Sequence, residues 1–382
     1  MQIFVPAETD NAERRVAMVP AAAAKLVKLG AQVRVQSGLG KTVHFSDAEY
    51  EAAGATISTD RAGSLLAADM VLRVGKPPRA ETGAMRSGCI HVSYLDPFND
   101  PTPLQALALA GVSAVCMEMI PRSTIAQKMD ALSSQASLAG YVAVLLAANR
   151  FDQILPMMTT PAGTIRPAQV FIIGVGVAGL QAIATAKRLG AAVEAFDTRP
   201  VVEEQVRSLG AKFVKVDLGE IGQTAQGYAR DLTPEQLAKQ HEVMAQRCAQ
   251  ADIVITAAQV FGRKAPQIVT TAMVEKMRPG SVVVDMAAEN GGNVECSRPD
   301  EDITVSGVRV LAYRNLAGRV PRVASQMYAS NLANFVDHFW NHETKSFRLD
   351  PADDILKQCL VTHSGTILND QLRKLAAPAI PA

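Results

Sequence analysis

The chain has 382 residues, 48% of them hydrophobic and 20% charged, which is enough for two globular domains and excludes a disordered protein. A formal net charge of +1, without a lysine- or arginine-rich run, excludes a nucleic-acid footprint. The five cysteines are widely spaced and form no C-x-x-C pair, so we expect buried, reduced thiols and no metal site.

The N-terminal sequence MQIFVPAETDNAERR has no basic segment followed by an apolar one, so we expect no secretory signal. The apolar run YVAVLLAA, residues 141–148, is far shorter than the ~20 residues that a membrane span needs. Both observations predict a soluble, cytoplasmic chain.

Short apolar runs alternate with helical patterns from one end of the chain to the other. Residues 20–30 (PAAAAKLVKLG), for example, have proline at the start and glycine past the end, as helices do. Buried parallel strands flanked by helices produce this alternation, so we expect an α/β fold with two doubly wound, Rossmann-like sheets. The expected strands are residues 2–5, 31–35, 69–74, 89–94 and 112–118 in the first sheet, and 170–174, 191–197, 212–217, 252–258, 281–287 and 308–313 in the second.

The segment SQMYASNLANFVDHFW, residues 325–340, is expected to be a helix. Tyr328, Leu332, Phe335 and Phe339 recur at helical spacing and form one apolar stripe, which is typical of a helix that docks on a core. We expect no strands after this helix, and we expect the segment to return to the first domain.

Residues 170–197 combine a strand, the pattern Gly174-x-Gly176-x-x-Gly179, a helix, a second strand and Asp197. The first glycine permits a tight turn, the second lets the backbone approach a pyrophosphate, and the third allows the helix to pack closely on the strand. The helix N-terminus favours the anionic phosphates. Together these features predict dinucleotide binding, with a glycine-rich structural turn as the alternative.

Asp197 decides which dinucleotide is expected. It ends the second strand 18 residues after Gly179, where its carboxylate can accept from ribose hydroxyls and repel a 2′-phosphate. Arg199 is a nearby cation that would tolerate NADP, but the carboxylate should dominate, so we expect NAD(H). The candidate cofactor-binding residues here are Gly174, Val175, Gly176, Val177, Gly179, Asp197, Thr198, Arg199 and Gln259.

A polar cluster interrupts the apolar sequence PRSTIAQKMDALSSQASLAGY, residues 121–141. If the segment is a helix, Gln127, Asp130 and Ser134 share one face at i, i+3 and i+7. Arg122 is positioned to pair with Asp130, and a glutamine amide offers the donor and acceptor that a nicotinamide carboxamide needs. A solvated helix face remains the alternative.

Five stretches resemble the NAD(H)-binding alpha-subunit domain of proton-translocating nicotinamide nucleotide transhydrogenase. The resemblance covers nearly the whole chain, and its second and third stretches are long and specific. The five are RRVAMVP (14–20), MEMIPRSTIAQKMDALSSQASLAGY (117–141), TTPAGTIRPAQVFIIGVGVAGLQAIATAKRLGA (159–191), VVVDMAAENGGN (282–293) and YASNLANF (328–335).

The resemblance implies a domain order and an assembly. In that family the dinucleotide domain is inserted into the first domain, so we expect domains at 1–136 with 325–382 and at 137–324. The expected activity is hydride exchange between NAD(H) and NADP(H), coupled to proton translocation. The expected partners are a membrane-spanning subunit, an NADP(H)-binding domain and a second copy in a homodimer, at the cytoplasmic face of a bacterial inner membrane.

The resemblance also implies site residues. Arg122, Gln127 and Asp130 match the loop that grips the nicotinamide end, and Ser133 matches a ligand serine. A mobile loop with a tyrosine closes over the cofactor in that family, which corresponds here to Gly227 and Tyr228. Ile125 and Lys128 depart from the family's usual residues in the nicotinamide loop, which affects the expected contacts with the partner.

Two other functions remain open from the sequence. Alanine dehydrogenase shares several motifs, but the positions of its catalytic lysine, histidine and aspartate correspond here to Gly75, Asp96 and Glu289, so only Arg15 remains. A non-catalytic NAD(H)-binding module is the second alternative. Hydride transfer between two nicotinamides needs no general base, only close and dry positioning of two carbon atoms about 3–3.5 Å apart, so we rank transhydrogenase first.

Overall fold

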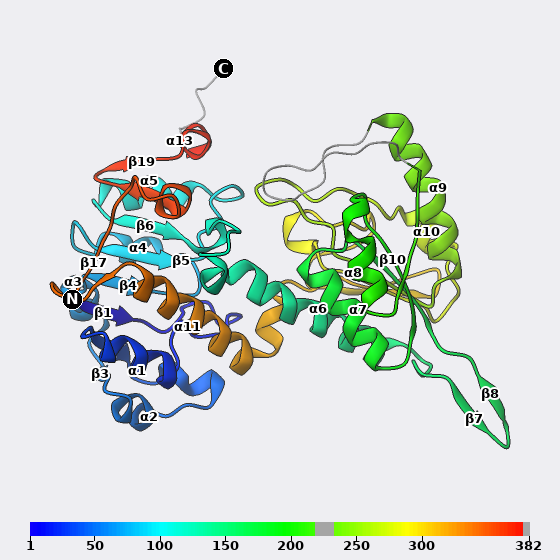
Figure 1. Ribbon diagram of the computed structural model, residues 1–382, viewed down its shortest axis with the longest axis horizontal. Coiled ribbons are helices and arrows are strands. Elements are labelled where there is room, and N and C mark those ends of the chain that lie inside the picture. The colour runs from blue at the N-terminus through cyan, green and yellow to red at the C-terminus, as the bar shows by residue number, and fades with distance from the viewer. Residues whose placement is uncertain (218–232, 377–382) are drawn as a thin grey trace. The chain divides into compact units, whose positions relative to one another are not determined.

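The computed structural model describes residues 1–217 and 233–376. The chain divides into two compact units, unit 1 with Met1–Gln135 and Val320–Ala382, and unit 2 with Ala136–Arg319 (Figure 1). Unit 1 is therefore discontinuous in sequence. The expected boundary after residue 324 falls inside helix α11 (Pro321–His338), which begins with a proline at its first position.

The described part of unit 1 contains an eight-stranded sheet with the order β19-β18-β6-β5-β4-β1-β2-β3. From β3 to β6 all neighbours are parallel, so this part has the doubly wound order 3-2-1-4-5-6, which reverses between β1 and β4. The strands are β1 (Gln2–Val5), β2 (Gln32–Gln36), β3 (Thr56–Ser58), β4 (Met70–Leu72), β5 (Ile90–Ser93), β6 (Ser113–Cys116), β18 (Leu360–His363) and β19 (Thr366–Ile367).

Helices cover both faces of this sheet. On one face, α1 and α11 contribute to a core in which the predicted stripe of Tyr328, Leu332, Phe335 and Phe339 is buried. The other face packs against α3 and α5, with Leu65, Leu104 and Leu107 in its core. The helices of unit 1 are α1 (Pro20–Lys28), α2 (Asp47–Ala52), α3 (Arg61–Ala67), α4 (Arg79–Thr82), α5 (Thr102–Leu109), α11, α12 (Leu356–Cys359) and α13 (Asp370–Ala376).

The prediction that no strands follow the tail helix is wrong. β18 pairs antiparallel with β6 and β19 pairs antiparallel with β18, so the C-terminal segment extends the sheet of unit 1. Two short strands, β16 (Trp340–Asn341) and β17 (Ser346–Phe347), form a separate ribbon. β18 has only four residues and directly follows α12, so the local pattern does not separate the strand from the helix.

In its described residues, unit 2 contains a seven-stranded sheet with the order β11-β10-β9-β12-β13-β15-β14, parallel except for β14. Its strand order reverses between β9 and β12, where open α/β sheets bind their ligands. The strands are β9 (Gln169–Ile173), β10 (Ala192–Phe196), β11 (Lys212–Phe213), β12 (Ile253–Thr256), β13 (Val282–Asp285), β14 (Asp302–Val305) and β15 (Val308–Leu311), and the helices are α7 (Val177–Arg188), α8 (Glu203–Ser208), α9 (Pro234–Gln250) and α10 (Thr271–Glu275). The two doubly wound Rossmann-like sheets are thus confirmed.

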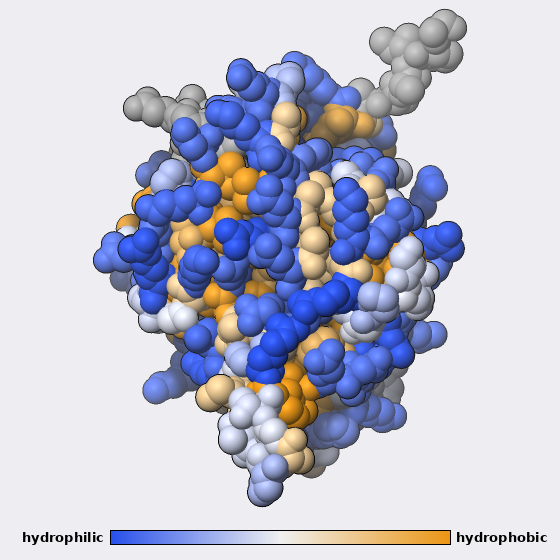
Figure 2. All heavy atoms as spheres, turned by 90° about the vertical axis from the view of Figure 1, so that its right-hand side faces the viewer, coloured by the Kyte–Doolittle hydropathy of each residue, from blue (hydrophilic) through white to orange (hydrophobic). Residues whose placement is uncertain are grey.

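A β-hairpin of β7 (Met158–Thr160) and β8 (Gly163–Ile165) projects from unit 2 (Figure 1). Both strands are fully exposed, and their exposed apolar residues include Met158 and Ile165. At the hairpin's base, Arg166 forms an ion pair with the buried Asp252. Figure 2, which views the molecule from the right-hand side of Figure 1, shows a mainly hydrophilic face with patches of apolar side chains between the hydrophilic ones.

Helix α6 (Ala131–Arg150) crosses the boundary between the two units. It is the one helix among the described residues that is long and apolar enough to span a membrane, and the core helix of a soluble protein meets the same criterion. The expected length of the apolar segment, based on residues 141–148 alone, was therefore too short. Four polar residues at positions 133–135 and 137 interrupt the N-terminal half of α6.

Acid sensitivity is predicted from His91 on β5. This side chain is fully buried, with Nε2 3.0 Å from Ser93 Oγ, and burial together with the charge of Arg73 lowers its pKa to about 3. The unfolded chain takes up this proton near pH ~6.5, so the stability of the fold decreases as the pH falls below that value.

His91→Asn keeps a polar group but removes the titration. We expect the decrease in unfolding free energy between pH 6.5 and 4 to become shallower, by up to about 1.4 kcal/mol per pH unit. Urea titrations at several pH values measure this slope. His342→Gln, which changes an exposed histidine, is the control and should leave the slope unchanged. An unaltered slope in His91→Asn would contradict the prediction.

Candidate functional site

The glycine-rich turn joins β9 to α7 at the point where the sheet of unit 2 reverses its order. Gly174 has a φ of +94°, and an added Cβ would lie 2.7 Å from Ala258 N. At Gly179 an added Cβ would overlap Gly174 O, so the helix could not approach the turn. Both glycines are required by the protein's own backbone.

Gly176 differs from its two neighbours in the motif. It is exposed, it forms the N-cap of α7, and a Cβ added there meets no protein atom within 4 Å. The fold therefore does not require glycine at this position. Open space in front of a twelve-residue helix N-terminus suits an anionic group such as a pyrophosphate.

Asp197 follows β10 and reaches back to the turn. Its Oδ2 accepts from Val175 N at 2.7 Å, and its Oδ1 accepts from Arg199 N at 2.9 Å. The Arg199 guanidinium binds the same carboxylate, while Thr198 between them is half-buried. The structure thus brings the predicted residues 174–179 and 197–199 together at the carboxyl ends of β9 and β10.

Gln259 lies in the loop after β12, which also contacts the glycine-rich turn through Ala258. Its Nε2 donates to Met286 O at 2.7 Å, and its Oε1 lies 3.5 Å from Asn290 Nδ2. These contacts join the loops that follow β12 and β13, two neighbouring strands. Gln259 therefore belongs to the same edge of the sheet as the turn.

Two buried residues that sequence analysis did not select hold these loops in place. Asp285, at the end of β13, accepts from Ser297 Oγ at 2.7 Å and from the backbone amides of Ala287, Asn293 and Val294. The Asn293 side chain then accepts from Ala258 N at 3.1 Å and donates to Ala258 O at 2.8 Å. The only sequence signal was an aspartate that ends an apolar strand shortly before the sequence GGN.

The other predicted group, residues 122–133, lies in unit 1. The expected continuous helix is not formed, because Gln127–Met129 is a 3-10 helix (η3) and α6 begins at Ala131. Asp130 has a ψ of 86°, and its carboxylate accepts from Ser133 N at 2.8 Å and Ser133 Oγ at 2.5 Å. An aspartate at this position caps the new helix instead of continuing the old one.

This break also changes the expected faces. Gln127 and Ser134 are not on one helix, and the buried residues of the segment are Ala126, Met129, Ala131 and Gln135. The expected apolar face of Met129, Leu132, Ala136 and Ala139 is therefore wrong beyond Met129. What the structure shows is a loop whose buried anchors leave Arg122, Gln127, Ile125 and Lys128 exposed.

Two asparagines of α11 hold this loop on unit 1. Asn331 Nδ2 donates to Lys128 O at 2.8 Å, and Asn334 Nδ2 donates to the same oxygen at 3.1 Å. Asn331 Oδ1 also accepts from Ser134 Oγ at 2.7 Å, so it joins both sides of the helix break. The exposed side chains of the loop are thus carried by a fixed backbone.

We predict that Asn331→Ala loosens the loop. The residue is buried and bonds both Lys128 and Ser134, so its loss should lower the unfolding free energy by about 1–3 kcal/mol. Amide exchange at residues 126–130 should accelerate as well. The matched control is Asn334→Ala, which removes one exposed donor to the same carbonyl and should cost less than about 1 kcal/mol. Equal effects of the two variants would contradict this account.

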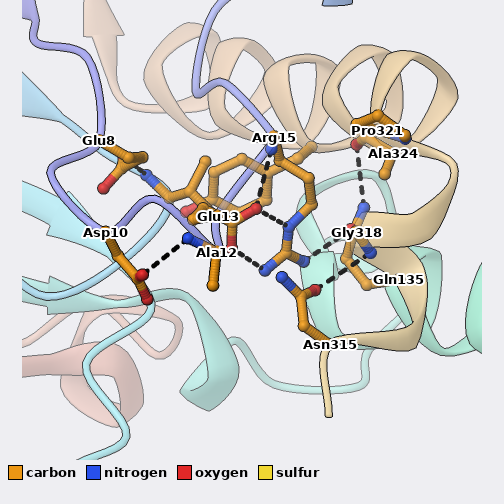
Figure 3. A network of polar contacts seen from close by, with 12 residues as sticks. Glu8, Asp10, Ala12, Glu13, Arg15, Gln135, Asn315, Gly318, Pro321 and Ala324 are labelled. Atoms are coloured by element: carbon orange, nitrogen blue, oxygen red, sulfur yellow. Dashed lines mark hydrogen bonds and ion pairs between the residues drawn. The ribbon is translucent and has the colours of Figure 1, made fainter. Parts of the chain in front are cut away.

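A second polar network surrounds Arg15 in unit 1 (Figure 3). Arg15 Nε and Nη2 bind the two carboxylate oxygens of Glu13 at 2.9 and 2.6 Å, and Nη1 donates to Gln135 Oε1 at 3.0 Å. Gln135 Nε2 in turn donates to Ala324 O at 3.1 Å. Arg15 is therefore held in a salt bridge, as the structural alternative predicted, although α1 begins only at Pro20.

The positions that would carry oxo-acid chemistry have other surroundings. Gly75 has no side chain, and Asp96 is a half-exposed carboxylate 3.5 Å from Lys76 Nζ. In unit 2, Glu289 accepts a hydrogen bond from Asn315 N. These contacts provide no positioned imidazole or lysine at residues 75 and 96 for protonating a carbonyl.

The remaining expectations concern cysteines, metals and the tyrosine loop. Cys89, Cys116, Cys248 and Cys359 are buried thiols and Cys296 is half-buried, and all five are free. Within residues 1–217 and 233–376, no three His, Cys, Asp or Glu side chains are grouped to hold a metal. Gly227 and Tyr228 lie outside the described residues.

The fold and the turn at β9 define a dinucleotide-binding α/β protein. Two family models match the chain, the alanine dehydrogenase/PNT N-terminal domain at residues 4–139 and the alanine dehydrogenase/PNT C-terminal domain at residues 143–370. The chain therefore belongs to the alanine dehydrogenase/PNT family.

Comparisons with individual proteins distinguish the two branches in that family name. An NAD(P) transhydrogenase alpha subunit of Rhodospirillum rubrum is 41% identical over 97% of this chain and 99% of its own length. The crystal structure of a transhydrogenase from Sinorhizobium meliloti has a TM-score of 0.87 and 42% identity, covering 96% of this chain and 100% of that one. Alanine dehydrogenase of Mycobacterium tuberculosis is only 29% identical, over 97% of this chain and 96% of its own length.

Proposed function

We propose that this protein is the NAD(H)-binding subunit of a proton-translocating transhydrogenase. In that role it binds NAD(H) and exchanges hydride with NADP(H) held on a partner domain. The observation that carries the proposal is the turn at Gly176, which is open in front of a helix N-terminus and lies next to Asp197. The similarity to transhydrogenase alpha subunits, greater than that to alanine dehydrogenase, supports the same branch.

The adenosine and pyrophosphate parts of NAD(H) are assigned to unit 2. Gly174, Val175, Gly176, Val177 and Gly179 form the turn and the helix start that would receive the pyrophosphate. Asp197 would accept from the ribose, with Thr198 and Arg199 beside it, and Gln259 follows the adjacent strand.

The nicotinamide end is assigned to the loop of unit 1. Gln127 is exposed and offers an amide that matches the nicotinamide carboxamide, and Arg122 is exposed on the same loop. Asp130 and Ser133 hold the helix start behind them, so we assign Asp130 a bracing role and Ser133 a role as a cofactor ligand. Gly227 and Tyr228 stay a prediction for the closing loop.

Hydride exchange explains what the site provides and what it does not require. Transfer between two nicotinamide rings moves no proton on either ring, so the chemistry depends on holding two carbon atoms close together with water excluded. An oxo-acid reduction would in addition require a proton donor and cations for the carboxylate. Gly75 and Asp96 stand where those groups would be needed, which places an alanine-dehydrogenase activity second.

The assembly follows from the same proposal. The partners are an NADP(H)-binding domain and a membrane-spanning subunit that couples hydride exchange to proton translocation, and a second copy of the chain completes a homodimer. The protein would then be peripheral on the cytoplasmic face of a bacterial inner membrane. A net charge of +1 gives no support for nucleic acid as a partner.

Alanine substitutions at two glycines test the dinucleotide site. Gly176→Ala meets no protein atom, so the unfolding free energy should change by less than about 1 kcal/mol, while NADH affinity should fall at least about tenfold because the methyl group meets the pyrophosphate. Gly179→Ala should instead lower the unfolding free energy by about 1–3 kcal/mol. NADH fluorescence titration and urea denaturation separate the two effects. Unchanged NADH affinity in Gly176→Ala would remove the turn from the binding site.

Gln127→Asn tests the nicotinamide loop. The variant keeps the amide but retracts it by one methylene, so NADH binding should change little, because the pyrophosphate and ribose contacts are elsewhere. Hydride transfer to an NADP analogue in the complex reconstituted with an NADP(H)-binding domain should fall steeply, since a misplacement of about 1 Å can cost ~10²-fold in rate.

The matched control is Gln358→Asn, an exposed glutamine on α12, which should leave binding and transfer unchanged. Comparable losses of binding and rate in Gln127→Asn would indicate that uniform binding had been removed. An unchanged transfer rate would return the loop to the solvated-surface alternative.

A further inference from the structure

The carboxylate of Asp197 is surrounded by four hydrogen-bond donors. Two are backbone amides, Val175 N on Oδ2 at 2.7 Å and Arg199 N on Oδ1 at 2.9 Å. The other two belong to the Arg199 guanidinium, with Nε on Oδ1 and Nη2 on Oδ2, both at 2.8 Å. Each oxygen thus receives one backbone donor and one guanidinium donor.

These four donors fill the carboxylate. An ionised aspartate offers about four lone-pair sites, two on each oxygen. Nη2 also donates to Val175 O at 3.2 Å, so the guanidinium joins the Asp197 loop to the glycine-rich turn. Only 8% of the Asp197 side chain and 17% of the Arg199 side chain are exposed. A ribose hydroxyl therefore finds no vacant acceptor site on Asp197.

The guanidinium presents the same pattern as the ribose. Its Nε and Nη2 offer two parallel donors, one to each carboxylate oxygen, as a bidentate arginine pair does. The vicinal 2′ and 3′ hydroxyls of a ribose offer two donors on adjacent atoms. We propose that the Arg199 side chain occupies the ribose subsite on Asp197 and is displaced by the ribose diol, which makes Arg199 a specificity-determining residue. This inference rests on the proposed role of Asp197 in NAD(H) binding.

Displacement leaves the rest of the subsite intact. The backbone bonds from Val175 and Arg199 need not change, so Asp197 stays in place while one acceptor site opens on each oxygen. The Arg199 backbone remains only two residues away, which keeps the released cation close to the 2′ edge of the ribose. There it attracts a 2′-phosphate, which Asp197 alone repels. Arg199 therefore weakens the preference for NAD(H) over NADP(H) in two ways.

Arg199→Met in the full chain tests the displacement. Without the competing guanidinium, NADH should bind more tightly, and without the cation NADPH should bind more weakly. The ratio of the two dissociation constants, NADPH over NADH, should rise about tenfold, the scale of one charge-assisted hydrogen bond. Fluorescence titrations with both nucleotides give this ratio, and thermal melting confirms that the variant is folded. Arg199→Lys keeps the charge but cannot fill both oxygens, so its ratio should lie between those of wild type and Arg199→Met.

Arg207→Met is the matched control for charge. Arg207 forms an exposed ion pair with Glu203 on α8, so its loss makes the same change in net charge and should leave the ratio unchanged. Weaker NADH binding in Arg199→Met would show that Arg199 holds Asp197 in position, and it would overturn the proposal.

Asp197→Asn separates this inference from the proposed function. If NADH affinity falls in Asp197→Asn but the ratio does not rise in Arg199→Met, the displacement is overturned while the ribose role of Asp197 stands. If Asp197→Asn binds NADH as tightly as wild type, the ribose role falls, and the inference that rests on it falls too.

Discussion

The organisation of unit 2 depends on how closely α7 approaches the turn after β9. Gly179 lies so near Gly174 O that a methyl group on Gly179 would overlap this oxygen. This approach aims the start of α7 at the carboxyl edge of the sheet, between β9 and β12. Asp197 then reaches Val175 N from the neighbouring strand. A helix held farther away would leave the same residues without a common centre.

The opposite side of that centre is fixed by buried polar groups. Asp285 binds the backbone that follows β13, and Asn293 carries this order across to Ala258 in the loop after β12. Because such groups are costly to leave without partners, they specify one arrangement of loops that have little apolar surface of their own. Asn331 has the same role in unit 1, where it fixes the backbone of the loop that carries Gln127.

The features that could be predicted from sequence are those with local causes. The glycine-rich turn, Asp197 and the apolar stripe of α11 follow from spacing alone, and the structure contains all three. The helix break at Asp130 was missed because two local tendencies compete there, and the side-chain cap on Ser133 prevails over continued helix. β18 was missed because its partner, β6, is distant in sequence. The contact between Arg15 and Gln135 spans 120 residues and has no periodic signal.

The open space at Gly176 separates two kinds of selection on one short motif. Gly174 and Gly179 are constrained by the chain's own backbone, so any lineage that keeps this fold must retain small residues there. Gly176 is constrained only from outside. In a descendant that no longer used a dinucleotide, mutation at this codon would accumulate while the other two glycines persisted. A motif reduced to its first and third glycines would then be the record of a lost cofactor in an intact domain.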